Sequence, residues 1–226
     1  MLVSDFMTAN PVTISPDTTH MEAVNLMREN GFRRLPVQDR KGSLVGIVVE
    51  KDLLSTQPSP ATSLSIWEIH GLLSKLKVKD FMSHPVYTVG AACPIEDAAR
   101  IMIAKRIGCL PVMDGEALVG IVTETDIFKI LTDMMAGGEP GARITVRLHH
   151  ERGVLAELAK AIASINGQIV SVSTFHDADE SFKRVTLKVA GANVEQLRDA
   201  IAAHADWEIM DTNQDGDCHQ PRAFGK

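Results

Sequence analysis

The feature that most constrains the fold of this chain is an internal duplication. Motifs near the start of the chain recur in the same order at an offset of 74 or 75 residues. The pairs are Asp5-Phe6-Met7 with Asp80-Phe81-Met82, Leu35-Pro36-Val37 with Leu110-Pro111-Val112, and Leu44-Val45-Gly46-Ile47-Val48 with Leu118-Val119-Gly120-Ile121-Val122. Each copy then reaches an aspartate, Asp52 or Asp126, six residues after its glycine. A fixed period of this kind indicates repeated supersecondary units.

Each copy predicts the same order of elements. A short strand is expected at residues 12–14 and 86–89, and a helix follows, with Asp17 as its predicted N-cap in the first copy. Two apolar strands come next, and Asp114-Gly115 is a strong hairpin signal between those of the second copy. A last helix is expected to begin near Glu50 or Glu124. One such unit has too small a core to stand alone, so we expect the two copies to pack with pseudo-twofold symmetry.

Linker signals divide the chain. Residues 1–56 form the first predicted repeat and residues 78–136 the second. Between them, Gln57-Pro58-Ser59-Pro60 marks a linker, and the segment 57–77 is predicted to include a helix. We interpret its apolar stripe as core or dimer contact, not as a ligand site; the stripe is Ile66, Ile69, Leu72, Leu73 and Leu76. The glycine-rich segment 137–141 is the predicted hinge.

The pattern changes after the hinge. Alternating apolar residues predict strands, and two apolar stripes at helical spacing predict helices, one ended by Asn166-Gly167 and one capped by Asn193. The expected order over residues 142–211 is βαββαβ, a ferredoxin-like arrangement. The polar residues 212–226 are expected to be disordered. The predicted fold class is therefore α+β, with two packed repeats and a C-terminal ferredoxin-like domain.

Composition excludes several classes of function. The net charge is −6 and no basic block stands out, which argues against nucleic-acid binding. No apolar run is long enough for a membrane span and the first residues lack a secretory signal, so we expect a cytoplasmic protein. Three scattered cysteines fit neither a disulfide framework nor a zinc site. Since no paired acid and base or metal set is present, we expect no catalytic residues, no metal and no cofactor.

The duplicated unit resembles the CBS-domain pair. The resemblance rests on the repeat and on the segment from Gly120 to Asp126, which matches the family's glycine, two hydrophobic residues, threonine, two variable residues and aspartate. It implies an adenosine-type ligand, such as AMP, ATP or S-adenosylmethionine, in the cleft between the repeats, with Thr123 and Asp126 on the ribose. It further implies base contacts from Thr13, Ile14 and Val37 in copy one and Thr88, Val89 and Val112 in copy two, phosphate contacts from Arg33 and Arg34, and ribose contact from Asp52.

Two observations qualify this interpretation. Thr123 and Asp126 also fit a capping box, in which each side chain binds the other's backbone N–H and no ligand is needed. In copy one, Val49 stands where Thr123 stands in copy two, so one hydroxyl is missing. Because one hydrogen bond contributes about 1 kcal/mol, we expect unequal sites, with the Thr123 and Asp126 site tighter. Arg33 and Arg34 are alternatively solvated surface charges.

The C-terminal unit resembles an ACT domain. The residues that carry the resemblance are Glu151-Arg152-Gly153-Val154-Leu155-Ala156-Glu157-Leu158 and Asn166-Gly167-Gln168-Ile169. It implies dimerisation and an amino acid at the dimer interface, with Gly153, Asn166 and Ile169 as candidate contacts. The usual acid of this turn is Asp, whereas the chain has His150-Glu151-Arg152, and the alternative is a domain used only for dimerisation.

The order CBS, CBS, ACT resembles the acetoin-utilisation accessory proteins of bacteria. It implies a regulatory ligand-sensing protein, a homodimer or higher homo-oligomer, that acts on an unknown regulated protein. The alternatives are a structural dimer or scaffold without a ligand, and an enzyme of the acetoin or nucleotide pathway.

Overall fold

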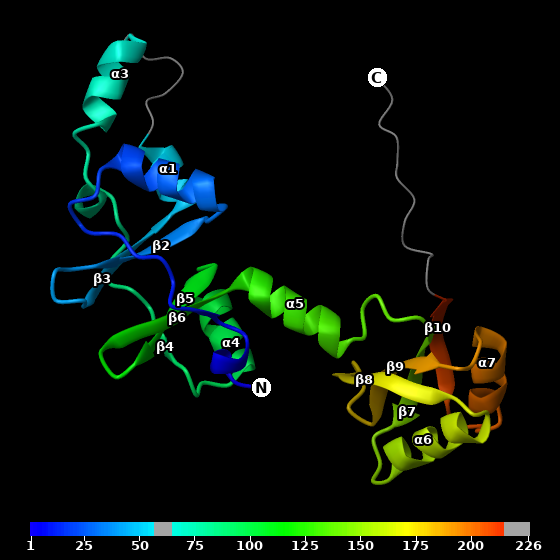
Figure 1. Cartoon of the computed structure of the whole chain (residues 1–226). Helices are drawn as coiled ribbons and strands as arrows, with labels where there is room; N and C mark the ends of the chain where they lie inside the picture. Colours follow the sequence, from blue (N-terminus) through cyan, green and yellow to red (C-terminus); the bar gives the residue numbers. More distant parts are fainter. Residues whose placement is uncertain (57–64, 215–226) are drawn as a thin grey trace, which may run out of the picture. The chain divides into compact units, whose positions relative to one another are not determined.

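The computed structural model describes residues 1–56 and 65–214. The chain divides into two compact units, residues 1–129 and 130–226 (Figure 1). No helix of the described residues is both long and apolar enough to cross a membrane.

The first unit holds both copies of the duplication, and each copy contributes the same elements. In the first copy these are α1 (His20–Asn30), β2 (Arg34–Gln38), β3 (Leu44–Val49) and α2 (Glu50–Ser55). In the second they are α4 (Ile95–Lys105), β5 (Cys109–Asp114), β6 (Ala117–Thr123) and α5 (Glu124–Met134). The remaining elements are the 3-10 turns η1 (Val3–Asp5) and η2 (Val78–Asp80), the short strands β1 (Thr8–Ala9) and β4 (Val89–Gly90), and α3 (Ile66–Leu73).

The two copies exchange their leading segments. Strand β1, which precedes the first copy, pairs antiparallel with β6 of the second, with Thr8 opposite Ile121. In the same way Ser83, which precedes the second copy, pairs with Ile47 of the first through two backbone hydrogen bonds of 2.9 and 3.1 Å. Each copy therefore completes the sheet of the other, and neither is a closed unit on its own.

This exchange brings the Asp-Phe-Met motif of each copy onto the Gly-Ile-Val motif of the other. Met82 of the second Asp-Phe-Met motif packs on Gly46 of the first copy, and Met7 packs on Gly120 of the second. A Cβ atom at either glycine would collide with the methionine side chain. Glycine is therefore required in the Gly-Ile-Val motif because a methionine of the other copy approaches its backbone.

Two local predictions for the first unit were wrong. The strand expected at residues 12–14 is a single bridge between Ile14 and Val37, and that expected at 86–89 is the two-residue β4. The N-cap of α1 is Thr19, not Asp17, because Thr19 accepts from the Glu22 N–H and Glu22 accepts from the Thr19 N–H in return. The predicted hairpin at Asp114-Gly115 is present between β5 and β6.

The predicted helix of the linker is α3. Its side chains are not all core, since Trp67 is 87% exposed and Leu72 is 58% exposed. The expected linker residues 57–64 lie outside the described residues.

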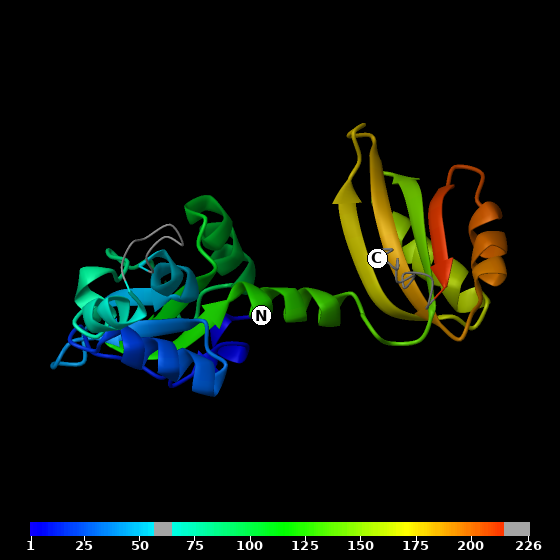
Figure 2. The same ribbon diagram turned by 90° about the horizontal axis from the view of Figure 1, so that it is seen from above.

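The second unit has the predicted βαββαβ order. Its elements are β7 (Ala142–His149), α6 (Val154–Ser164), β8 (Gln168–His176), β9 (Phe182–Ala190), α7 (Val194–Ala202) and β10 (Glu208–Gln214). The antiparallel sheet has the order β10-β7-β9-β8, and Figure 2 shows both helices on one of its faces. Asn193 caps α7 as predicted, accepting from the Gln196 N–H.

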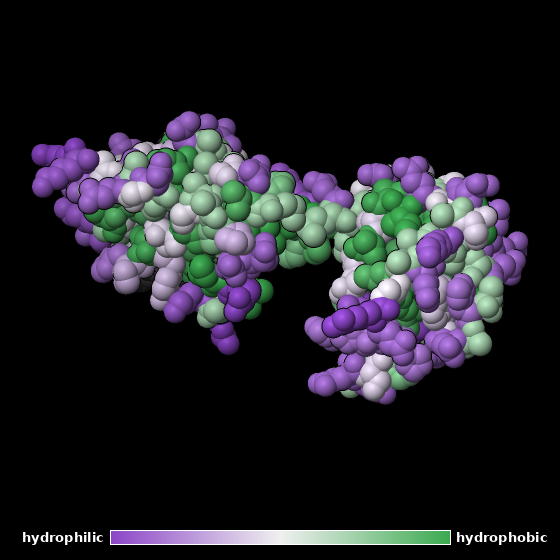
Figure 3. All heavy atoms as spheres, turned by 90° about the horizontal axis from the view of Figure 1, so that it is seen from below, coloured by the Kyte–Doolittle hydropathy of each residue, from purple (hydrophilic) through white to green (hydrophobic). Residues whose placement is uncertain are grey.

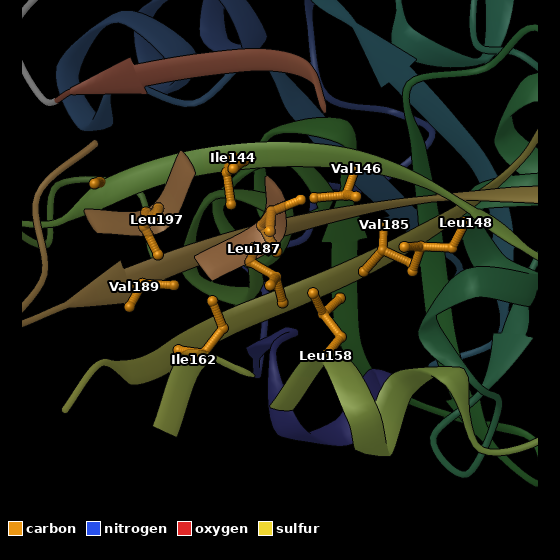
Figure 4. Packing of buried hydrophobic residues seen from close by; sticks show 11 residues of the cluster. Ile144, Val146, Leu148, Leu158, Ile162, Val185, Leu187, Val189 and Leu197 are labelled. Carbon is orange, nitrogen blue, oxygen red and sulfur yellow. The ribbon is translucent and has the colours of Figure 1, made fainter. Parts of the chain in front are cut away.

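The core of the second unit lies between the sheet and its helices. Leu158 and Ile162 of α6 and Leu197 of α7 point towards alternate residues of β7 and β9, as Figure 4 shows. Strand β10 extends to Gln214, which pairs with Ala142, so residues 212–214 do not belong to a disordered tail. Residues 215–226 lie outside the described residues.

Candidate functional site

The candidate ribose-binding pair lies where β6 ends and α5 begins. The Thr123 hydroxyl donates to Asp126 Oδ2 over 2.7 Å, and the Thr123 N–H donates to the same oxygen over 2.9 Å. The Asp126 N–H in turn lies 3.4 Å from the Thr123 hydroxyl. The capping box is therefore present, and it engages one of the two Asp126 oxygens. Both side chains are half-buried.

Thr123 and Asp126 line a cavity that both copies build. Its volume is about 300 Å³. The second copy contributes Ile121, Thr123, Thr125 and Asp126, and the first contributes Thr8, Asn10, Pro11, Val12, Gly31, Phe32, Arg33 and Arg34. The exchange of leading segments brings Pro11 and Val12 to this position, beside the start of α5. We call this the Asp126 cavity.

The two arginines of the first copy meet the helix start of the second. Arg34 Nη2 lies 3.0 Å from Glu124 Oε1, and its side chain is only 14% exposed. Arg33 Nη2 lies 3.5 Å from the Thr125 hydroxyl. Gly108 leaves room for Arg34, since a Cβ there would lie 2.6 Å from Arg34 Nη2. The structure places Arg33 and Arg34, the predicted phosphate contacts, at the Asp126 cavity, which lies at the helix start of the other copy.

A second cavity occupies the equivalent position at the first copy. Its volume is about 430 Å³, and Val49 lies where the Asp126 cavity has Thr123. Gly108 and Cys109 line it at the positions that correspond to Arg33 and Arg34. Burial raises the pKa of the Cys109 thiol to about 11, against the opposing effect of the nearby Arg34. Asp52 accepts from the Val49 N–H over 3.0 Å and is not among the residues that line this cavity.

The predicted base contacts lie elsewhere. Ile14 and Val37 form a backbone bridge, and Val89 and Val112 pair between β4 and β5. All four side chains are buried in the core, whereas Thr13 is half-buried and Thr88 exposed. None of the six lines either of the two cavities. The cavities are lined instead by residues two or three positions earlier in the chain, namely Pro11, Val12, Pro85 and Val86. The Pro-Val pair that recurs in both copies was the sequence signal that could have identified them.

The candidate residues of the second unit flank helix α6. Gly153 precedes the helix with a φ of +89°, and Asn166 follows it with a φ of +57°. Ile169 is half-buried in β8 and packs against the core. In the part of the chain that the structure describes, no group of three or more His, Cys, Asp and Glu side chains is placed to hold a metal ion.

Comparisons with known proteins identify both units. The sequence model of the CBS domain matches residues 3–58 and 78–133, and that of the TTHA0829-like ACT domain matches residues 140–213. A CBS domain-containing protein of Dictyostelium discoideum is 32% identical over 60% of this chain and 94% of its own length. Protein MJ1404 of Methanocaldococcus jannaschii is 36% identical over 65% of this chain, and the match covers 35% of that protein.

A solved structure supports the same assignment. A crystal structure described as an acetoin utilization protein (AcuB) from Vibrio cholerae superposes with a TM-score of 0.50 and 31% identity, covering 62% of this chain and 98% of that one. The chain therefore belongs to the CBS-domain proteins, and it consists of a tandem CBS pair followed by a TTHA0829-like ACT domain.

Proposed function

We propose that the chain is a regulatory protein that binds an adenosine-type nucleotide in the Asp126 cavity. The observation that carries this proposal is the meeting of Thr123 and Asp126 from one repeat with Arg33 and Arg34 from the other at a single cavity. A carboxylate and two guanidinium groups in one cavity match a ligand that has both hydroxyl donors and an anionic group.

The chemistry of each part fits such a ligand. Asp126 Oδ2 is engaged in the cap, and Oδ1 can accept from the two adjacent hydroxyls of a ribose. The start of α5 provides backbone N–H groups and the positive end of a helix dipole, which favour a nearby phosphate. Pro11, Val12, Phe32 and Ile121 supply the apolar surface against which a base can lie. The cavity volume is at the lower end of the range for small-molecule sites.

The capping box and the ligand site are compatible. The cap uses one Asp126 oxygen and holds the carboxylate at the cavity, so the contact that caps α5 would also orient the other oxygen towards a ribose. A purely structural cap would not require the two arginines of the other repeat to lie at the same cavity.

Regulation follows from the composite nature of the site. A ligand in the Asp126 cavity contacts both repeats, so its binding favours one geometry of the pair over others. We propose that this shift acts on a partner protein, in an acetoin-utilisation context such as that of the Vibrio cholerae relative, and that the ACT domain provides dimerisation and an amino-acid site near Gly153, Asn166 and Ile169.

Exposed apolar side chains support a homodimer. Ile103 and Phe128, which border an apolar cavity between α4 and α5, are 77% and 65% exposed. Figure 3 shows patches of hydrophobic residues among hydrophilic ones on both units. Light scattering of the full chain measures the oligomeric state.

The test is nucleotide-dependent thermal stabilisation of the full chain. A ligand that binds only the folded state raises the unfolding midpoint, so AMP, ATP and S-adenosylmethionine are compared at rising concentrations. Thr123→Ala combined with Asp126→Ala is expected to abolish the shift. An unchanged shift in that double variant would remove the site assignment. A stable dimer that binds no adenosine compound would favour a scaffold, and turnover of a nucleotide would favour an enzyme.

A further inference from the structure

We propose that Glu124 sets how much negative charge the Asp126 cavity accepts, by partly neutralising Arg34. This inference rests on the proposed function, because it concerns which members of the adenosine-type class the site prefers. It assigns a selectivity role to a residue that does not itself line the cavity.

The contact is a single, partly shielded ion pair. Glu124 Oε1 lies 3.0 Å from Arg34 Nη2, and the Arg34 side chain is 14% exposed while that of Glu124 is 54% exposed. The low exposure of Arg34 limits screening by solvent on its side of the pair. A guanidinium has five N–H donors, so the bond to Glu124 leaves others that can bind an anion in the cavity.

The charges around the cavity balance. Arg33 and Arg34 bring two positive charges, while Asp126 at the cavity and Glu124, which is paired with Arg34, bring two negative ones. Asp126 is needed to bind the ribose, so Glu124 is the negative charge that can set the affinity of the cavity for the anionic part of the ligand. Because these formal charges cancel, each added phosphate meets a site with no net positive charge. The geometry therefore favours a nucleoside monophosphate, or a ligand with a small net charge, over a triphosphate.

Glutamine at position 124 separates charge from geometry. Glu124→Gln keeps an oxygen that accepts from Arg34, so the guanidinium stays in place, while one negative charge is removed. Anionic ligands are then expected to bind more tightly, and more so the higher their charge, whereas uncharged adenosine is unaffected. If Glu124 served only to orient Arg34, the substitution would leave all affinities unchanged or weaken them.

The duplication supplies a matched control. Glu50 opens α2 as Glu124 opens α5, and the Glu50 N–H donates to Arg33 O as the Glu124 N–H donates to Gly108 O. The residue that corresponds to Arg34 in the other copy is Cys109, which offers no charge to pair with. Glu50 forms no ion pair with Arg34 and lines a neighbouring cavity with Arg33, so Glu50→Gln is expected to change nucleotide affinity less than Glu124→Gln does.

The experiment is a calorimetric charge series on the full chain. Adenosine, AMP, ADP and ATP are titrated without divalent cations into the wild type, Glu124→Gln, Glu50→Gln, Arg34→Gln and the double variant Arg34→Gln with Glu124→Gln. In Glu124→Gln, AMP is expected to bind about threefold tighter, ATP by a larger factor, and adenosine as in the wild type. The gain is expected to shrink in the Arg34→Gln background, because the effect passes through Arg34.

Each outcome decides something. An unchanged charge preference in Glu124→Gln, an equal gain for adenosine, or the same gain from Glu50→Gln overturns the inference, as does a full gain without Arg34. If the wild type binds no adenosine compound, the proposed function fails. The role of Glu124 is then tested by the same variants with inorganic phosphate and pyrophosphate, where an unchanged affinity ratio between the two anions overturns it.

Discussion

The two CBS repeats share a backbone plan and differ in the chemistry placed on it. Both exchange a leading segment, both pack a methionine on the glycine of the other copy, and both open their last helix with a glutamate two residues before an aspartate. At equivalent positions, however, the Asp126 cavity has Thr123 and Arg34 where the other has Val49 and Cys109. The comparison teaches that the two repeats keep one backbone arrangement, while substitutions at a few cavity positions give the two cavities different side-chain chemistry.

A buried position of the core differs as well. His20 and Ile95 occupy the same place in the two repeats, since their N–H groups donate to the equivalent Leu76 O and Met1 O. His20 is 2% exposed, with its Nε2 3.1 Å from Leu53 O, and its Nδ1 has no hydrogen-bond partner among the described residues.

Exchanging these two residues is expected to give the largest effect. Ile95→His buries an imidazole in an apolar site and is expected to lower the free energy of unfolding by about 3 kcal/mol. His20→Ile removes an unpaired nitrogen, and Leu53 O keeps its bond from the Thr56 hydroxyl, so it is expected to stay within about 1 kcal/mol of the wild type. Urea unfolding of both variants measures the difference. Equal losses would show that the two cores are equivalent at this position.

The cysteine that replaces an arginine gives the next comparison. Because burial raises the pKa of Cys109 to about 11, its thiolate is scarce at neutral pH. Its alkylation at pH 8 is expected to be about 100-fold slower than that of free cysteine. Alkylation followed by mass spectrometry of the Cys109 peptide over a pH range measures this. The rate is expected to keep rising with pH towards 11, and a plateau near pH 9 would contradict the assigned environment.

Single aspartate variants compare the two helix caps, of which only that of Asp126 lies at a cavity. Asp126→Ala is expected to weaken AMP binding about 30-fold, because hydrogen bonds to a charged group are lost. Asp52→Ala removes the equivalent contact to the Val49 N–H and serves as the control for helix capping. It is expected to change AMP affinity little. Calorimetric titration measures both affinities, and equal losses from both substitutions would mean that loss of the helix cap, and not of a ligand contact, weakens binding.

The smallest expected effect is that of the threonine hydroxyl. Thr123→Val is expected to weaken AMP binding about fivefold, and the reverse change Val49→Thr to strengthen binding at the second cavity by a similar factor. Both variants are titrated with AMP by calorimetry, and the affinities of the two cavities are fitted separately. If Val49→Thr changes nothing, the inequality comes from the arginines rather than from the hydroxyl.

Sequence reasoning found the repeats and the capping pair Thr123 and Asp126 because their signals are short sequence patterns. The spacing from Gly120 to Asp126 and the second copy at a fixed offset need no knowledge of the fold. The partners of Asp126 could not be predicted in the same way, because Arg33 and Pro11 reach it only through the exchange of segments between copies. The base contacts were assigned to Ile14 and Val37, whose apolar character serves the core, and sequence does not distinguish a residue that faces the core from one that faces a cavity.

The exchange of leading segments also bears on how this module could arise and be divided. A half-chain that ends before Val78 would present β3 without Ser83 along its edge, and a half-chain that starts at Val78 would present β6 without β1. Each fragment carries the segment that the other lacks, so the two fragments, expressed separately and mixed, are expected to associate into one complex. A protein with a single repeat of this design would face the same requirement, which the association of two identical molecules meets.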